Sequence, residues 1–343
     1  MKKLFFALSL IYITVIILLF SCNKPSYSPG TAGQTSLNQL FASIRSTPQT
    51  LSVTAGRDTI VYGANGTMLH FYTYSFKDAA GNIITSGTID LQLTEMYKAG
   101  DMISNRATTF ANGQILQSSG QINMVATLNG NEVYANSYGI GFKHGNSSSA
   151  PMALFYGASA NSDSVATWTQ SDSTKNGTTT TGTVTDTVSS TPKSYFYFDT
   201  CSSFTWANCD WFYTNDSPET TVSIVLPDNS FNATNTQMYL VLPNVNRWGN
   251  TADIFIAVLS NVEDKGLGSS SYTAKTNTLQ LISEGNTNIV PAGLNYKLVV
   301  LANKNGTYYY YEQQGTIPHN GLTATATLVS QPESTIISNL AGL

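Results

Sequence analysis

Short stretches in which apolar and polar residues alternate dominate the chain after residue 49. Residues 68–76, 89–93 and 122–126 each alternate, and turn signals such as Asn65-Gly66 separate them. Alternation with a period of two is the pattern of a strand with one buried face, and Asn-Gly is a strong hairpin signal. Short strands at this spacing, punctuated by turns, predict a β-sandwich or a barrel.

A second strand-rich block begins at Tyr195. Its clearest hairpin joins residues 296–301 to residues 308–311 through Asn305-Gly306. The two blocks together predict an all-β protein with two β-sandwich domains and short flanking helices. The first sandwich covers residues 48–157, and the second covers residues 195–343.

A short helix is predicted over residues 37–45, because Leu37, Leu40, Phe41 and Ile44 fall at i, i+3, i+4 and i+7. We expect this stripe to pack on the edge of the first sandwich. The alternative is a membrane-surface or partner helix, although such helices usually carry several basic residues.

A second helix is predicted from Pro332, with Ser334 or Thr335 near its start. We expect three of its apolar residues to face inward: Ile336, Ile337 and Leu340.

Residues 158–194 change character, and between residues 178 and 191 Thr, Ser and Gly occupy nearly every other position. Such a stretch has too little apolar surface to fold by itself. It is either a linker between the two sandwiches or an extended hairpin on the surface.

The beginning of the chain reads as an export signal. Lys2-Lys3 is followed by an apolar run over residues 4–20 and then by Ser21-Cys22, which is the order of a secretory signal peptide. A cysteine directly after the small residue resembles a bacterial lipoprotein signal, in which Cys22 carries the acyl chains, such as palmitate. We therefore expect residues 1–21 to be a signal peptide and residues 22–47 to be a tether with the short helix. The alternative is an ordinary signal-anchor helix.

This signal predicts an outer-membrane lipoprotein held to the membrane by its lipid anchor. Residues 23–26 contain no acidic residue, and the first acidic residue after Cys22 is Asp58. Acidic residues soon after the cysteine are common in surface-exported lipoproteins of the Bacteroidota. The sequence therefore allows two locations, the periplasmic face of the outer membrane and the cell surface.

Composition agrees with an envelope protein. Only 10% of the residues are charged, well below the usual quarter. Without residues 1–21 the formal charge is −6 rather than −4, because Lys2 and Lys3 leave and no acidic residue does. A mildly acidic chain without a basic run argues against a nucleic-acid partner.

The chain has three cysteines. If Cys22 carries the lipid, Cys201 and Cys209 are left as a pair in an oxidising compartment, where disulfides persist. We expect a bridge between them. The alternative is two separate buried thiols.

Eight segments resemble a group of uncharacterised Bacteroidota lipoproteins. They are Gly66–Phe71, Phe76–Asn82, Ser86–Leu91, Glu95–Tyr97, Gly100–Asn105, Trp206–Tyr213, Val290–Gly293 and Asn305–Tyr309. Residues 290–317 are also similar to the last strands of carboxypeptidase-regulatory-like sandwiches. These resemblances imply a β-rich architecture and a location in the cell envelope, and they identify no catalytic residue.

Three tripeptides around Ser164, Ser173 and Thr187 resemble the O-glycosylation motif of secreted Bacteroidota proteins.

Motifs for catalysis, metal binding or a cofactor are absent from the sequence. The three histidines, His70, His144 and His319, lie far from one another and from every cysteine, so no local zinc spacing exists. We therefore predict no cofactor, no metal and no catalytic residue. A hydrolase would need a carboxylate pair, for which Glu95, Asp101 and Asp210 are the candidates.

Clustered aromatic residues are the remaining candidates for a binding function. Trp206, Trp211 and Tyr213 lie within eight positions, and residues 308–311 are all tyrosine. Exposed rings stack on sugar faces, whereas alternate rings of a strand fill a core. The resulting hypothesis is a non-catalytic protein for binding, adhesion or scaffolding, with a glycan or another envelope protein as partner. Glycan binding by these three rings is its sharper form, and the alternative is a hydrolase of envelope or extracellular polysaccharide or peptide.

Overall fold

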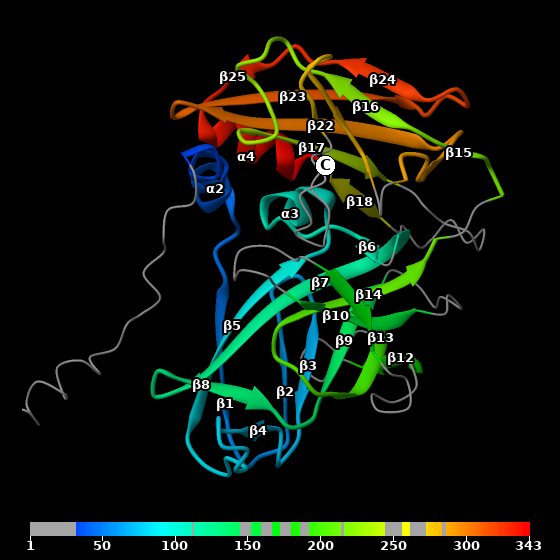
Figure 1. Ribbon diagram of the computed structural model, residues 1–343. Helices are drawn as coiled ribbons and strands as arrows, with labels where there is room; N and C mark the ends of the chain where they lie inside the picture. Colours follow the sequence, from blue (N-terminus) through cyan, green and yellow to red (C-terminus); the bar gives the residue numbers. More distant parts are fainter. Residues whose placement is uncertain are drawn as a thin grey trace, which may run out of the picture.

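The computed structural model describes residues 32–111, 113–144, 152–158, 167–171, 180–185, 192–213, 216–243, 256–260, 272–282 and 286–343. Strands hold 54% of this part of the chain, which confirms the all-β prediction. Figure 1 shows two strand-rich bodies, one above the other, with the helices close to where they meet. Within the described residues, no helix combines the length and the hydropathy that crossing a membrane requires.

The lower body is the N-terminal sandwich. Its larger sheet, sheet A, runs in the order β1-β5-β7-β14-β10-β11, with three short strands beside this path. The strands of sheet A are β1 (Gln49–Thr54), β4 (Phe76–Lys77), β5 (Thr88–Met96), β6 (Phe110–Ala111), β7 (Gln114–Leu128), β8 (Asn131–Ala135), β10 (Ala153–Ala158), β11 (Thr167–Gln170) and β14 (Trp206–Phe212).

Sheet B lies opposite sheet A and has the order β12-β13-β9-β3-β2. Its strands are β2 (Thr59–Tyr62), β3 (Met68–Phe71), β9 (Tyr138–His144), β12 (Thr180–Thr185) and β13 (Pro192–Cys201). Alternate residues of the two sheets fill the space between them, for example Leu91 and Ile122 from sheet A and Phe142 from sheet B. The expected hairpin at Asn65-Gly66 is present as β2 and β3, with a φ of 101° at Gly66.

The upper body is the C-terminal sandwich, made of sheets C and D. Sheet C has the order β19-β20-β16-β24, with β19 (Tyr272–Thr273), β20 (Thr278–Gln280), β16 (Val222–Val225) and β24 (Leu322–Thr325). Sheet D has the order β18-β17-β22-β23-β25, with β18 (Ala257–Ser260), β17 (Thr236–Leu242), β22 (Asn295–Lys304), β23 (Thr307–Thr316) and β25 (Val329–Ser330). A separate two-stranded ribbon pairs β15 (Glu219–Thr220) with β21 (Val290–Pro291).

The hairpin between β22 and β23 confirms the turn predicted at Asn305-Gly306. Both residues adopt positive φ angles, 53° and 81°. A two-residue turn of this shape suits the right-handed twist of paired strands and favours Asn followed by Gly. Ten residue pairs extend this hairpin from Asn295 to Thr316.

The division of the chain differs from the predicted boundary at residue 195. Strands β13 and β14 pair with β9 and β7, so residues 192–212 belong to the N-terminal sandwich. In the described parts of residues 158–194, β11 pairs with β10, and β12 pairs with β13. This segment therefore extends both sheets of the first sandwich and does not link the two bodies. Local alternation marks a strand, but it carries no information about which distant strand will pair with it.

The central strands of sheet D, β17 and β22, are largely buried on both of their faces. Met238, Leu240 and Leu242 of β17 point into the C-terminal sandwich, whereas Tyr239 and Val241 point into a second apolar cluster. We call this second cluster the junction core. It contains Leu37, Leu40, Phe41, Ile44, Met96, Ala99, Met102, Ile103, Ala107, Ala111, Leu116, Phe155, Trp168, Trp206, Tyr239, Val241, Val258, Val299, Leu301, Tyr310, Ile336 and Leu340.

Three helices supply part of the junction core: α2 (Ala32–Ile44), α3 (Ala99–Ser104) and α4 (Glu333–Ala341). The apolar stripe predicted over residues 37–45 is buried, and each large side chain contributes about 1.5–3 kcal/mol. However, α2 packs on β22 and α4, at the second sandwich rather than on the edge of the first. In α4 the expected Ile336 and Leu340 are buried, but Ile337 is 42% exposed.

Backbone hydrogen bonds join the two sandwiches directly. The amide of Ser118 donates to the carbonyl of Ile256 at 2.9 Å, and the amide of Ile256 donates back at 3.1 Å. The amide of Thr109 likewise donates to the carbonyl of Val258 at 2.8 Å. The segment that leads into β18 therefore continues the hydrogen bonding of β7.

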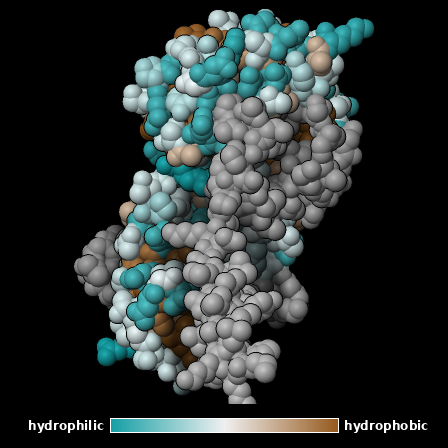
Figure 2. Space-filling model, turned by 60° about the vertical axis from the view of Figure 1, so that its left-hand side comes forward, coloured by the Kyte–Doolittle hydropathy of each residue, from teal (hydrophilic) through white to brown (hydrophobic). Residues whose placement is uncertain are grey.

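The described surface of the upper body in Figure 2 is mainly hydrophilic, because the apolar residues of sheet D face its two cores.

Helix α3 crosses α4 at Gly100. A Cβ atom on Gly100 would lie 1.8 Å from the carbonyl oxygen of Leu340. Backbone cannot approach a side chain so closely, so only glycine permits this contact. The crossing fixes the end of the chain against the first sandwich.

We predict that Gly100→Ala lowers the free energy of unfolding by about 3 kcal/mol, because overpacking forces α3 and α4 apart. Without that contact, alanine in a helix would instead stabilise by about 1 kcal/mol. The control is Gly130→Ala, where no atom lies within 4 Å and only a φ of 80° is disfavoured; this variant should lose about 1 kcal/mol. Urea unfolding measures both variants, and an equal or smaller loss for Gly100→Ala would contradict the prediction.

Candidate ligand-binding site

A hollow of about 160 Å³ opens beside the ends of β7 and β14 and the ribbon formed by β15 and β21. Its position depends on pairing between distant segments. The amide of Tyr213 donates to the carbonyl of Ile115 at 2.9 Å, which holds the end of β14 against β7. Glu219 pairs with Pro291 in the ribbon. The residues that line the hollow are Gly113, Gln114, Ile115, Tyr213, Glu219, Ile289 and Pro291.

The lining combines one aromatic ring with polar side chains. Tyr213 is half-buried, whereas Gln114 and Glu219 are exposed. Ile289 and Pro291 are buried and form an apolar part of the wall. An amphipathic ring next to an amide and a carboxylate can stack on a ligand face and hydrogen-bond to hydroxyl groups. This chemistry suits a polyhydroxylated ligand.

Of the three aromatic residues proposed for glycan binding, only Tyr213 lines this hollow. Trp206 is 5% exposed and belongs to the junction core, so the prediction for this residue is wrong. Trp211 is half-buried and packs against the sandwich core. The face of sheet A that carries Trp206 is covered by other elements of the junction core, and no local sequence pattern indicates such a cover.

The tyrosine run at residues 308–311 also serves packing. Tyr309 and Tyr311 pack against the sandwich core, whereas Tyr308 and Tyr310 pack against the junction core. The period of two thus places rings on both faces of β23, and the rings on each face contact one of the two cores.

Cys201 and Cys209 are free buried thiols, so the expected disulfide is not formed. Cys201 ends β13 in sheet B, whereas Cys209 lies within β14 in sheet A. The loop between them crosses from one sheet to the other, and closeness in sequence did not bring the sulfur atoms into a bond. Burial raises the pKa of both thiols, and Asp210 raises that of Cys209 further.

The three candidate carboxylates lie on different elements, and two of them lie on opposite faces of one sheet. Glu95 shares the inner face of β5 with Leu91 and Leu93, whereas Asp210 lies on the opposite face of sheet A, on the same side of β14 as Trp206. Asp101 is on α3, outside the sheet.

Glu95 has a structural role instead. It accepts hydrogen bonds from the amides of Asn65 and Thr67, at 2.7 and 2.8 Å, and from the side chain of Gln49 at 2.7 Å. The carboxylate therefore holds the turn of the β2–β3 hairpin.

Asp210 is fully buried beneath the junction. One carboxylate oxygen accepts a hydrogen bond from Asn208 Nδ2, whose Oδ1 accepts from Ser118 Oγ at 2.9 Å. The other oxygen, Oδ1, has no hydrogen-bond partner. Because burial penalises the charged form, the pKa of Asp210 is raised well above its ordinary value.

The histidines are dispersed, and the described residues contain no cluster of His, Cys, Asp and Glu that could hold a metal ion. His319 is exposed in the loop before β24, and His144 ends β9. His70 has partners that sequence reasoning missed: Nε2 lies 2.9 Å from Asp58 Oδ1 and Nδ1 lies 3.2 Å from the hydroxyl of Tyr197. Nothing in the sequence around His70 indicates Tyr197, which lies on a distant strand of the same sheet.

Four predicted modification sites lie outside the described residues: Cys22, Ser164, Ser173 and Thr187.

No family model, curated protein or solved structure matches the chain. The resemblance to Bacteroidota lipoproteins and to carboxypeptidase-regulatory-like sandwiches therefore stays a prediction. Function has to be argued from the residues of the hollow. Gln114 and Glu219 are the members that the sequence did not reveal, because β15 meets β21 only through long-range pairing.

We predict that Asp210→Asn raises the thermal midpoint at pH 8, because asparagine mimics the protonated acid. Because the pKa of Asp210 is raised in the folded state, the protonated carboxyl group makes its full contribution to stability below the pKa of the unfolded chain, near 3.8. That contribution is lost as the pH rises through the folded-state pKa. The gain of Asp210→Asn should therefore shrink on acidification. The control is Asp78→Asn, since hydrogen bonds from Asn82 lower the pKa of Asp78 and give the opposite sign. A pH-independent effect of Asp210→Asn would contradict the argument.

We also predict that iodoacetamide leaves Cys201 and Cys209 unmodified in the folded protein, because both thiols are buried and their pKa values are raised. After unfolding without a reductant, the peptide that contains both residues should gain two carbamidomethyl groups in mass spectrometry. The single variants Cys201→Ser and Cys209→Ser should each gain one. A peptide that reacts only after reduction would show that the bridge exists.

Proposed function

We propose that this chain is a lipid-anchored envelope protein that binds a glycan, without catalysis, in the hollow beside Tyr213. The observation that carries this proposal is the lining itself, in which one half-buried tyrosine ring lies with the side chains of Gln114 and Glu219. Ligand pockets typically combine an apolar wall with a few polar groups that fix orientation.

The charge pattern favours binding over hydrolysis. Glycoside hydrolysis requires two carboxyl groups on either side of the scissile bond. Among the described residues that line the hollow, Glu219 is the single carboxylate. Glu95 and Asp210, the candidates for a hydrolase, point to opposite faces of sheet A. A lone carboxylate is sufficient to accept hydrogen bonds from sugar hydroxyl groups.

The proposed location in the cell envelope rests on the sequence. Cys22 would carry the acyl chains and residues 23–31 would form the tether before α2. Two or three acyl chains anchor a protein stably, at about 0.8 kcal/mol for each buried methylene. The ligand would then be a glycan of the envelope or of its surroundings.

A glycan array tests the proposal. We expect the full chain to bind a subset of glycans, and we expect Tyr213→Ala to weaken that binding about tenfold, since ring stacking contributes about 0.5–1.5 kcal/mol beyond burial. Gln114→Ala should weaken it as well. The matched control is Tyr74→Ala, which removes an equally large ring that is 60% exposed and does not line the hollow.

Two results would overturn the proposal. One is the absence of any bound glycan, or binding that neither Tyr213→Ala nor Gln114→Ala changes. The other is cleavage of a bound oligosaccharide that Glu219→Gln abolishes, which would make the protein a hydrolase.

A further inference from the structure

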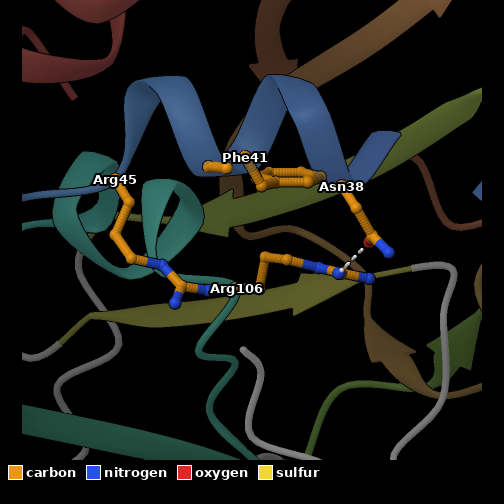
Figure 3. Close-up of a pocket in the computed structure, with 5 residues that line it drawn as sticks. Asn38, Phe41, Arg45 and Arg106 are labelled. Atoms are coloured by element: carbon orange, nitrogen blue, oxygen red, sulfur yellow. Dashed lines mark hydrogen bonds between the residues drawn. The ribbon is translucent and has the colours of Figure 1, made fainter. Parts of the chain in front are cut away.

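A second, smaller hollow lies between α2 and the segment after α3. It encloses about 40 Å³ and is lined by Asn38, Phe41, Ala42, Arg45 and Arg106. Figure 3 shows both guanidinium groups on the same side of α2, beneath the helix. Arg45 reaches in from the C-terminal end of α2, and Arg106 extends under Phe41 towards Asn38. Two cations therefore share a small concave space.

The backbone at Arg106 adopts a conformation that favours glycine. Its φ is 55°, and it directly follows Asn105 at the end of α3. The amide of Ala107 donates to the carbonyl of Met102 at 2.8 Å, and that of Arg106 donates to the carbonyl of Ile103 at 2.9 Å. This is the Schellman pattern, in which glycine is the usual residue at the left-handed position. Glycine adopts this conformation without strain, whereas arginine is strained in it.

The Arg106 side chain is held in place but not neutralised. Nη1 donates to Asn38 Oδ1 at 2.9 Å, and the guanidinium carbon lies 5.0 Å from the centre of the Phe41 ring. These contacts orient the group without supplying negative charge. No carboxylate in the described part of the chain forms an ion pair with Arg106, and its buried Nε has no hydrogen-bond partner.

A further buried donor packs against Phe41, although it does not line the hollow. Tyr239 packs edge-on against Phe41, with ring centres 6.3 Å apart, and its buried hydroxyl has no hydrogen-bond partner. Buried polar groups are normally paired, so such groups need an explanation. Here two buried donors, Arg106 Nε and the Tyr239 hydroxyl, occur around one aromatic ring, next to a second guanidinium group.

We propose that this hollow binds a phosphate group, with Arg45 and Arg106 as its cationic ligands. A guanidinium group presents a rigid set of donors that matches phosphate oxygens. One water needs about 10–15 Å³ of such space, so the hollow has room for a few oxygen atoms and not for an extended ligand. The bound anion would also offset the repulsion between the two guanidinium groups.

The phosphate could belong to a lipid headgroup or to a soluble compound. Helix α2 begins ten residues after Cys22, which fully extended chain spans in roughly 35 Å. If Cys22 is acylated, the start of α2 lies within that reach of headgroup phosphates, and the hollow follows roughly one to three helical turns further along. The headgroup source alone depends on the proposed anchor, and the phosphate site is independent of the proposed glycan site.

Isothermal titration calorimetry on the full chain in uncharged detergent micelles tests the site. The two probes are inorganic phosphate and glycerophosphoglycerol, which is an anionic lipid headgroup without its acyl chains. We expect Arg106→Gly to weaken binding at least tenfold while it relieves the backbone strain at this position. Arg45→Gln should weaken binding similarly, and Arg106→Lys, which keeps the charge, should weaken it less than Arg106→Gly.

The control is Arg57→Gln, which removes an exposed arginine of the β1–β2 turn that does not line the hollow; its affinity should stay within twofold of the unsubstituted chain. Binding of inorganic phosphate alone would support a soluble ligand, and binding of the diester would support a headgroup. Binding of neither probe, or equal affinity in Arg106→Gly and Arg57→Gln, would overturn the proposal. Far-ultraviolet circular dichroism of each variant confirms that it is folded.

Discussion

The burial of the central strands of sheet D on both faces is the constraint on which the rest of the molecule depends. A sandwich needs only one apolar face on each sheet, and the other face usually meets water. In sheet D, β17 is buried along its whole length, because the second face carries Tyr239 and Val241 into the junction core. Helices α2, α3 and α4 and the outer face of sheet A are needed to cover it. The two sandwiches therefore share a core instead of being joined only by a linker.

The same constraint explains where polar groups are placed. Closing the junction over sheet A takes Asp210, Asn208 and Ser118 out of water. Backbone hydrogen bonds between Ser118 and Ile256 satisfy the main chain there, but Asp210 keeps an oxygen without a partner. A buried carboxyl group in this position costs less when it is protonated, which couples the stability of the junction to pH. The hollow beside Tyr213 depends on the pairing of the same strands, β7 and β14.

Sequence patterns were sufficient where a structure is set by neighbours in the chain. The stripe of Leu37, Leu40, Phe41 and Ile44 predicted a helix with a buried face, and Asn305-Gly306 predicted the turn of a hairpin of ten residue pairs. The predictions for Trp206 and for the Cys201–Cys209 bridge were wrong for one reason. Both depend on which sheet a strand joins and on what covers that sheet, and these are long-range choices. Tyr213 was found from sequence, but Glu219, which lines the same hollow, was not, because β15 meets β21 only in the folded chain.

The two proposed sites stand at opposite sides of the junction, since Figure 1 shows α2 at one end and β15 at the other. Each hollow combines residues of distant segments: Asn38 and Phe41 of α2, which rests on β22 and α4, line one with Arg106, and Ile289 and Pro291 line the other with Ile115 of the first sandwich. A ligand that contacts all of these segments would stabilise the arrangement that brings them together. Both hollows therefore depend on the packing of the junction core, even though no residue lines both of them.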